Sequence, residues 1–236
     1  MKEQYVGDVN DYRKYALLRH FAIEGRVRVG VCWMLTPPTT GNLRQYLTLP
    51  EKWRDFDSEL FGQLVQILDS DVPSRLGTIE SCGIIPRALF FNTLLTDRTD
   101  RSSYFSAALS HLEQADLVFF DPDNGIAPSR TPKTRRGSSQ FIHLDEIADA
   151  YDRRHSVLIY QHFPRVPRDQ FIDKLGAELA RASAGALLWC FRTPFAAFLL
   201  LIHPYHEARL TPAAKSIPEH WKPRFIDGKQ LVQVDG

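Results

Sequence analysis

Two carboxylates and an amide stand together in the segment 121–125, Asp-Pro-Asp-Asn-Gly, directly after the apolar run 117–120. Short β-prone runs that end in Gly, Pro and Asn predict a buried strand that leads into a turn. Open α/β sheets hold their ligands at the carboxyl ends of strands, so this turn is where we first expect chemistry. The same residue types also form ordinary polar turns. The candidate catalytic residues of the turn are Asp121, Pro122, Asp123 and Asn124.

A second polar group ends the run 156–162, which also predicts a buried strand. His162 closes this run, and Tyr160 lies two residues before it. Because the carboxyl ends of neighbouring parallel strands share one sheet edge, His162 is a candidate base that faces Asp121. Tyr160 is a candidate substrate contact, although a histidine at a strand end is also commonly structural. We expect one pocket to collect Asp8, Lys14, Asp121, Asn124 and His162.

Basic residues crowd the loop 130–136, a few positions after the acidic turn. The whole chain has a formal net charge of +1, so binding to a nucleic acid would depend on local patches such as this one. A charge run is also typical of a solvated loop. The residues expected to contact phosphates are Arg130, Lys133, Arg135 and Arg136.

The chain of 236 residues is 44% hydrophobic and 24% charged, which is an ordinary globular composition. We expect one α/β domain that covers residues 1–236. The three cysteines are widely spaced in apolar sequence, which predicts buried reduced thiols rather than a disulfide or zinc framework. Residues 1–5 show no targeting segment, and the longest apolar run, 195–202, is too short to span a bilayer. These features predict a soluble cytoplasmic protein that does not bind a membrane.

Hydrophobic periodicity predicts helices separated by short apolar strands. The predicted helices are 12–23, 58–68, 86–95, 102–114, 144–151 and 168–182, and the first is amphipathic and capped by Asp8 or Asn10. The predicted strands are 27–35, 76–80, 117–120, 156–162, 186–191 and 196–203. Strands that alternate with helices imply right-handed crossovers and a parallel sheet covered on both faces. We therefore expect a three-layer α/β fold with a seven-stranded, mostly parallel sheet and an antiparallel C-terminal hairpin.

This layout resembles the Rossmann-like methyltransferases that use S-adenosylmethionine, in which a final hairpin adds an antiparallel strand to an otherwise parallel sheet. The turn is similar to the signature of the adenine-N6 methyltransferases, Asp/Asn-Pro-Pro-aromatic. Asp121 and Pro122 match its first two positions, whereas Asp123 and Asn124 replace its second proline and its aromatic residue. The resemblance implies a methyltransferase that acts on an amine of a nucleic acid, with the turn orienting the target amine towards the methyl group.

The segment 7–15 resembles the start of ribosomal-RNA adenine methyltransferases and of the three-Cys-motif partner proteins, where a short polar motif leads into a lysine-bearing helix beside the cofactor pocket. That resemblance implies that Lys14 lies near the methionine carboxylate, and that Glu80, at the end of a second strand, holds the ribose. A lysine on the solvated face of a helix is the plainer alternative. The expected cofactor-binding residues are Asp8, Asp11, Lys14, Thr36, Gly41 and Glu80.

Four short patterns together also resemble an uncharacterised bacterial family. They are Gly-Asp-Val-x-Asp-Tyr-x-Lys-Tyr from residue 7, Trp-x-Leu-Thr-Pro from residue 33, Asp-Pro-Asp-Asn-Gly from residue 121 and Tyr-Gln-His from residue 160. They extend from residue 7 to residue 162. This resemblance implies no activity of its own.

Three other functions are compatible with the same residues. An apolar run followed by Asp-x-Asp resembles the nucleophile loop of haloacid-dehalogenase-type phosphohydrolases, which use magnesium. A nuclease could hold magnesium through Asp121 and Asp123 with His162 as base. A non-catalytic nucleic-acid-binding module on a degenerate methyltransferase fold is the third alternative. For the catalytic functions, we expect Asp121→Ala to abolish activity while leaving the fold intact, because loop carboxylates contribute little to packing.

Overall fold

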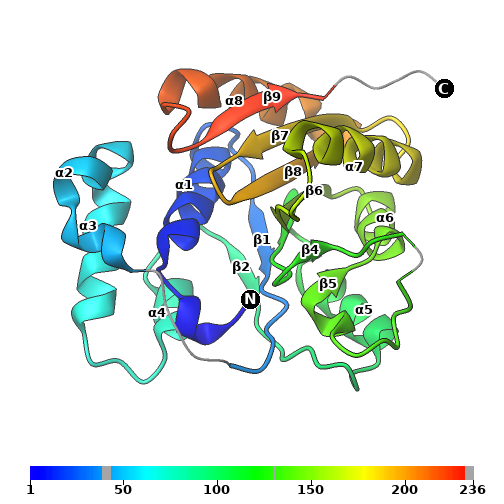
Figure 1. Ribbon diagram of the computed structural model, residues 1–236, viewed down its shortest axis with the longest axis horizontal. Coiled ribbons are helices and arrows are strands. Elements are labelled where there is room, and N and C mark those ends of the chain that lie inside the picture. Colours follow the sequence, from blue (N-terminus) through cyan, green and yellow to red (C-terminus); the bar gives the residue numbers. More distant parts are fainter. Residues whose placement is uncertain (39–43, 130, 232–236) are drawn as a thin grey trace.

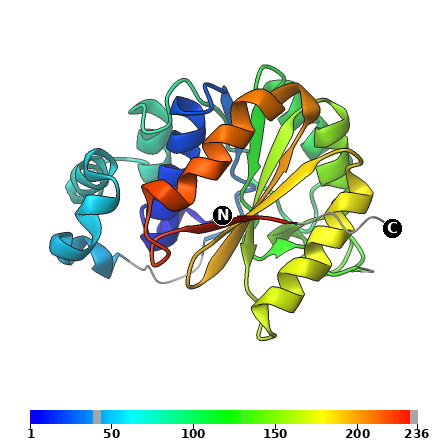
Figure 2. The same ribbon diagram turned by 90° about the horizontal axis from the view of Figure 1, so that it is seen from above.

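The computed structural model describes residues 1–38, 44–129 and 131–231 of the chain (Figure 1). A seven-stranded sheet forms the middle layer, with helices on both of its faces (Figure 2). Its strands are β1 (Val29–Cys32), β2 (Leu89–Phe91), β3 (Leu117–Phe120), β6 (Ser156–His162), β7 (Leu187–Arg192), β8 (Ala196–Ile202) and β9 (Asp227–Gln230). The strand order is β2-β1-β3-β6-β8-β7-β9. Strands β8 and β9 run opposite to the other five, so the expected mostly parallel, seven-stranded α/β sheet is confirmed.

The helices divide between the two faces of the sheet. On one side of the sheet, a shared hydrophobic core includes α1 (Val9–Ile23), α3 (Ser58–Asp69), α4 (Arg75–Ser81) and α8 (Glu207–His220). The other face packs against α5 (Arg101–His111), α6 (Leu144–Asp152) and α7 (Arg168–Ala182). Smaller elements are helix α2 (Pro50–Trp53), the two-stranded sheet of β4 (Gly125–Ile126) and β5 (Phe141–Ile142), and 3-10 turns at Glu3–Tyr5, Gln45–Thr48, Arg54–Phe56, Ser138–Gln140 and Pro204–His206.

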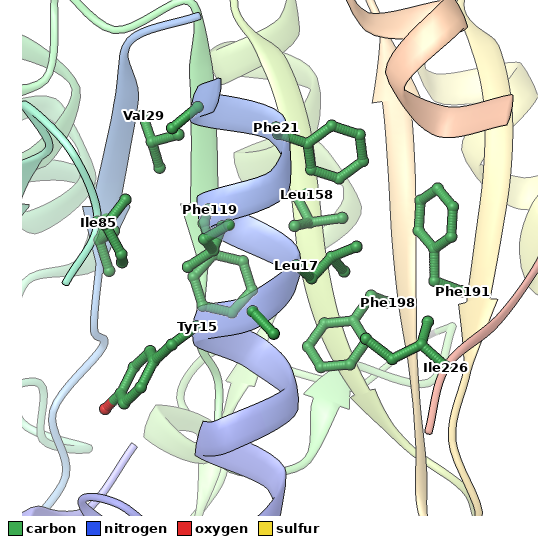
Figure 3. Packing of buried hydrophobic residues seen from close by; sticks show 14 of the residues in the cluster. Tyr15, Leu17, Phe21, Val29, Ile85, Phe119, Leu158, Phe191, Phe198 and Ile226 are labelled. Carbon is green, nitrogen blue, oxygen red and sulfur yellow. The ribbon is translucent and has the colours of Figure 1, made fainter. Parts of the chain in front are cut away.

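The central strands are apolar along their whole length because both of their faces are buried. In β3, Phe119 packs into the α1 side of the core, whereas Val118 and Phe120 pack into the α5 side. Figure 3 shows Phe119 and Leu158 of the sheet against Leu17 of α1. A one-residue shift of β3 would exchange these sides.

Helix α1 is buried on all sides, which differs from the amphipathic helix that the sequence predicts. Residues 11–22 are all buried, including the charged residues Arg13 and Lys14. The helix lies between the sheet on one side and α3 and α8 on the other, so no face is left for solvent (Figure 2). Asp8 caps it, as expected, by accepting hydrogen bonds from the backbone amides of Asn10 and Asp11.

Two sequence-based assignments are wrong. The segment 76–80 belongs to helix α4, because Ser74 caps it by accepting from the Gly77 amide. The segment 86–95 contains strand β2 rather than a helix, because its apolar residues 89–91 pair in parallel with β1. Tertiary pairing therefore outweighed the local helical pattern in this segment. Cys82, expected to be buried, is exposed at the end of α4.

The antiparallel pair β7–β8 is confirmed, but it is not the end of the fold. Helix α8 and strand β9 follow it, and β9 pairs with the outer side of β7. Among the described helices, none is both long and apolar enough to cross a membrane.

Strand β1 stands where the chain reverses its course across the sheet. The connection through α3 and α4 leads from β1 to β2 on one side, and α5 then leads to β3 on the other side of β1. In open α/β sheets such a reversal opens a ligand-binding crevice at the carboxyl ends of the strands. The 121–125 turn follows β3 at this place.

Candidate functional site

A cavity of about 430 Å³ lies where the start of α1 meets the carboxyl ends of β3 and β6. We call it the acidic cavity, because four aspartates contribute to its wall. The five residues expected to share one pocket all line it, so that expectation is confirmed. The wall consists of Met1, Lys2, Tyr5, Asp8, Asn10, Asp11, Lys14, Asp121, Pro122, Asp123, Asn124, Tyr160 and His162.

Lys14 joins the turn to α1 through a buried network of ion pairs. Its Nζ lies 2.6 Å from Asp121 Oδ2 and 2.6 Å from Asp11 Oδ1. Asp11 Oδ2 also accepts hydrogen bonds from the Tyr15 hydroxyl and the Gly7 amide. Burial lowers the pKa of Lys14, but the two carboxylates more than offset this, so its pKa is raised and the ammonium stays charged. Lys14 is thus neither a solvated surface lysine nor a cation without partners.

Asp121 is a buried group, not the accessible loop carboxylate that its turn sequence predicts. It is 2% exposed, and burial raises its pKa above the usual carboxyl value while Lys14 opposes the shift. Removing it would leave the Lys14 ammonium buried with one partner fewer, which costs stability. The expected result for Asp121→Ala therefore changes from loss of activity alone to loss of activity together with stability.

The α-amino group of Met1 lies between the ends of β1 and β3. It donates hydrogen bonds to the carbonyl oxygens of Trp33, Met34 and Asp121 at 3.1, 3.1 and 2.8 Å. It also pairs with Asp123 Oδ1 at 3.1 Å. These contacts tie the loop after β1 to the turn after β3.

Asp123 is held from its other side by Thr36 and Lys2. The Thr36 hydroxyl donates to Asp123 Oδ2 at 2.6 Å, and Lys2 Nζ lies 3.5 Å from the same oxygen. Burial would raise the pKa of Asp123, but the Met1 ammonium, the Thr36 hydroxyl and Lys2 hold it below its usual value. Thr36 therefore holds the Asp123 carboxylate in place, but it does not itself line the acidic cavity.

Asp8 combines helix capping with an unfavourable position for a negative charge. It is 6% exposed, and burial together with the nearby charge of Asp11 raises the pKa of Asp8 to about 7. Its Oδ1 nevertheless accepts from the Asn10 and Asp11 amides at 2.8 and 2.9 Å. A neutral acceptor could make the same two hydrogen bonds.

We therefore expect Asp8→Asn to stabilise the protein at pH 8 but not at pH 4. In the wild type, the unfolded chain releases the Asp8 proton near pH 4 while the folded chain keeps it until about pH 7. Stability consequently falls as the pH rises through this window, by on the order of a few kcal/mol, and stays low above it. Urea unfolding of both proteins at pH 4, 6 and 8 measures the difference, which should widen with pH.

Asp100→Asn is the matched control, because Asp100 caps α5 at the surface. Hydrogen bonds from Ser103 lower the pKa of Asp100, so its contribution is lost as the pH falls. That loss occurs only at about pH 4 and below, so the difference between this variant and the wild type should stay nearly constant from pH 6 to pH 8. A constant difference for Asp8→Asn from pH 4 to pH 8 would contradict the prediction.

His162 and Tyr160 close the acidic cavity at the end of β6. The Tyr160 hydroxyl and His162 Nε2 lie 3.2 Å apart, and the Tyr160 ring packs against Lys14 Nζ at 5.3 Å. Burial raises the pKa of Tyr160. His162 projects towards solvent, but its ring is partly covered, and this burial together with the Lys14 charge lowers its pKa. His162 is therefore neutral at pH 7.

The remaining expected cofactor residues do not line this cavity. Glu80 lies on α4, where its carboxylate accepts hydrogen bonds from Trp33 Nε1 and Asn92 Nδ2, both at 2.9 Å. Asn92 directly follows β2, so Glu80 reaches the carboxyl end of that strand from the side. Gly41 lies outside the described residues.

The structure separates the basic loop into residues with different surroundings. Lys133 pairs with Asp145 and with Glu146, which also binds Arg101. Arg135 and Arg136 are exposed and line a hollow of about 250 Å³ next to Asn124. Arg130 lies outside the described residues.

A second cavity, of about 450 Å³, shares Asn124 and His162 with the acidic cavity. We call it the apolar cavity, because its wall is mostly Ile126, Ala127, Pro128, Phe141, Phe163, Pro164, Phe171 and Leu175. None of these eight residues was a candidate from the sequence. The available signal was the Phe-Pro-Arg segment 163–165, which follows a strand at the same sheet edge.

Asn124 stands between the two cavities and is held by amide groups. Its Nδ2 donates to Gln140 Oε1 at 2.8 Å, and its carbonyl oxygen accepts from Gln161 Nε2 at 3.2 Å. Gln161 Oε1 in turn accepts from the Ile126 amide at 2.8 Å. Gly125, with φ of +101°, passes so close to Gln161 that a Cβ would lie 2.4 Å from its side chain. With Nδ2 engaged, the side-chain oxygen of Asn124 is the atom suited to accept a hydrogen bond from a bound amine.

Within the part of the chain that the structure describes, no group of three or more His, Cys, Asp and Glu side chains is placed to hold a metal ion. The turn after β3 supplies two carboxylates, Asp121 and Asp123. Their charges are already matched by the Lys14 and Met1 ammonium groups.

Comparison with family models and with curated proteins gave no match. Among solved structures, the chain is similar to the protein LPL1258 from Legionella pneumophila str. Philadelphia 1, which is described by the family model DUF519. The two share 11% sequence identity over 98% of each chain, with a TM-score of 0.45. A likeness of this size carries no functional argument.

Proposed function

We propose that the protein is an S-adenosylmethionine-dependent methyltransferase that acts on an amine of a nucleic acid. One observation carries the proposal: the turn after β3 lies beside the reversal at β1, and its Asn124 walls both cavities. Ligands of open α/β sheets bind at such a reversal. The antiparallel strand β8 between β6 and β7 also supports the proposal, because it matches the sheet of the methyltransferases that the sequence resembles.

The acidic cavity fits the charges of S-adenosylmethionine, which are a sulfonium, an ammonium and a carboxylate. Asp11 and Asp123 supply negative charge to its wall, and Lys2 supplies a positive charge. Glu80 does not line this cavity, so its expected contact with the ribose hydroxyls stays a prediction. When bound, the cofactor supplies a methyl group on a positively charged sulfur.

The residues at the boundary of the two cavities would position the target amine. The side-chain oxygen of Asn124 would accept a hydrogen bond from the target amine. The Asp121–Pro122 backbone would fix the position of the turn that carries Asn124. Lys14 would act as a positioning residue, because its Nζ is already paired with Asp121 and Asp11. Methyl transfer to an amine gains mainly from alignment and from exclusion of water, so this arrangement needs no strong base. This fits the neutral, partly covered His162.

Magnesium-dependent phosphoryl transfer and nuclease chemistry have weaker support. A phosphohydrolase of the Asp-x-Asp kind needs its first aspartate free to attack phosphorus. Asp121 is 2% exposed and bonded to Lys14, and Asp123 is bonded to two ammonium groups and a hydroxyl. Both carboxylates would have to exchange these partners for a metal ion.

We expect S-adenosylhomocysteine and S-adenosylmethionine to raise the melting temperature. At a ligand concentration of about 100 times Kd, the gain is roughly 3 kcal/mol, or about 5–10 °C for a chain of this size. Asn10→Arg should reduce this shift strongly, because Asn10 is on the wall of the acidic cavity and a longer cationic side chain would occupy it. Thermal denaturation with each ligand measures both effects.

Gln66→Arg is the matched control, since Gln66 is exposed on α3 and lies outside both cavities. It should keep the full ligand-induced shift. A shift with magnesium alone and none with S-adenosylmethionine or S-adenosylhomocysteine would overturn the methyltransferase proposal in favour of phosphoryl chemistry. No shift with any of them would favour the non-catalytic module.

A further inference from the structure

We infer that the apolar cavity takes one unpaired base of a single-stranded nucleic acid, and that arginines on both sides of this cavity bind the flanking phosphates. The inference deepens the proposed function and rests on it for the chemistry at the base. Binding of the strand itself requires no cofactor, so the two can be tested separately.

The wall of the apolar cavity offers aromatic side chains to a flat ring. Phe141, Phe163 and Phe171 are half-buried on its wall, so part of each ring is accessible. The Phe163 and Phe171 rings lie 6.5 Å apart at an angle of 72°, an edge-to-face arrangement, and a base would stack on the accessible part of either ring. Every base has an apolar face, so stacking on such side chains tolerates any sequence. Asn124, at the boundary with the acidic cavity, offers a polar atom to the edge of the base.

Arginines flank this cavity on two sides. The hollow of Arg135 and Arg136 shares Asn124, Pro128 and Phe141 with the apolar cavity, so the two are adjacent.

A further hollow, of about 480 Å³, shares Phe163 and Pro164 with the apolar cavity and is lined by Arg165 and Arg168. Both arginines are exposed. The guanidinium of Arg168 lies 4.8 Å from the Phe163 ring centroid and donates to the Pro194 carbonyl, which holds it beside the cavity.

The apolar cavity and the two hollows beside it carry much more positive charge than the chain as a whole. The three hollows are lined by five cationic side chains, Arg135, Arg136, Arg165, Arg168 and Lys174, and by one carboxylate, Glu178. The whole chain has a formal net charge of only +1. A row of cations with an aromatic cavity at its centre matches a polyanion with exposed bases, and a base-paired strand could place a base in the cavity only at the cost of unpairing it.

The test is fluorescence anisotropy with a labelled single-stranded oligonucleotide of about 12 nucleotides, as DNA and as RNA, and with a duplex of the same length. We expect single strands to bind more tightly than the duplex, with log affinity falling against log salt at a slope of about −3. Reversing Arg165 and Arg168 to Glu should flatten the slope by about 1.4, and reversing Arg135 and Arg136 should do the same.

Phe163→Leu probes stacking separately from charge. It should weaken binding roughly 5- to 100-fold without changing the salt slope. The control is Arg153→Glu with Arg181→Glu, two exposed arginines near the ends of α6 and α7 that lead into the amino ends of β6 and β7. Melting temperatures verify that every variant is folded.

The inference would be overturned if the control and either arginine pair lost equal affinity for the single strand. Equal affinity for the duplex and the single strand would also overturn it. So would an unchanged affinity of the Phe163→Leu protein. If single strands bind as expected while S-adenosylmethionine does not, the proposed function fails and the binding site stands. If S-adenosylmethionine binds and no oligonucleotide does at low salt, this inference fails and a small amine is the substrate.

Discussion

Replacing Lys14 with methionine should destabilise the protein by about 3–5 kcal/mol, the usual cost of removing one partner from a buried ion pair. Lys14 Nζ lies 2.6 Å from a carboxylate oxygen of Asp11 and 2.6 Å from one of Asp121. Both carboxylates are nearly inaccessible to water. Without it, two like charges would be buried beside one another. Urea denaturation at pH 7 measures the loss of unfolding free energy.

Arg153→Ala is the control for this prediction, because it removes the exposed ion pair between Arg153 and Asp149. Exposed pairs contribute about 0–1 kcal/mol. Adding Asp121→Asn to the Lys14→Met protein should recover part of the lost stability, because it removes one of the uncompensated charges. A Lys14→Met protein as stable as Arg153→Ala would mean that the buried network carries little of the stability.

The second large effect is expected for Gly125→Ala. Gly125 has a positive φ that costs an alanine about 1–3 kcal/mol, and the new Cβ would lie 2.4 Å from the Gln161 side chain. Gln161 would have to release the Ile126 amide or the Asn124 carbonyl, so both the turn and the boundary of the cavities would move. We therefore expect the free energy of unfolding to fall by more than about 2 kcal/mol. S-adenosylmethionine and the single-stranded oligonucleotide should both bind more weakly.

Gly62→Ala is the matched control, because Gly62 lies within α3 and a Cβ there meets no atom within 4 Å. In a helix this change stabilises by about 0.5–1 kcal/mol. Differential scanning calorimetry and ligand titration of the two variants compare the effects. Equal melting temperatures for the two variants would show that the turn tolerates a side chain at position 125.

The order of most elements could be predicted from the sequence because their signals are local. The runs 117–120 and 156–162 are apolar throughout, and a segment of that kind with polar residues at its end becomes a buried strand followed by a turn. Strand β3 begins and ends where the sequence predicts, as does β6. The position of the turn at the carboxyl edge of a parallel sheet followed from the alternation of strands and helices.

Strand β2 and helix α4 could not be predicted in the same way. The segment 89–91 has three residues, and only its pairing with β1 decides that it is a strand. Helix α4 depends on its Ser74 cap more than on its apolar pattern. Short elements of this kind take their structure from neighbours that are distant in sequence.

For the candidate site, the sequence by itself determined which residues would meet. Asp8, Asp121, Asn124 and His162 lie at or beside the end of an element, and parallel topology brings those ends to one edge, where Lys14 of α1 reaches them. Only the tertiary structure decided whether these residues are buried and which groups they pair with. Helix α1 is covered on every side, so Lys14 and Asp121 are buried and must pair with each other.

The tertiary structure also decided what lies next to the turn. The apolar cavity is assembled from β4, β5, the loop after β6 and helix α7, and no local pattern links these four segments. Burial and contact between such segments are properties of the whole packed chain, whereas strand ends and turns are properties of a few consecutive residues. For this reason the sequence determined the place of the site, and the packing of α1 and α7 decided its charges and its shape.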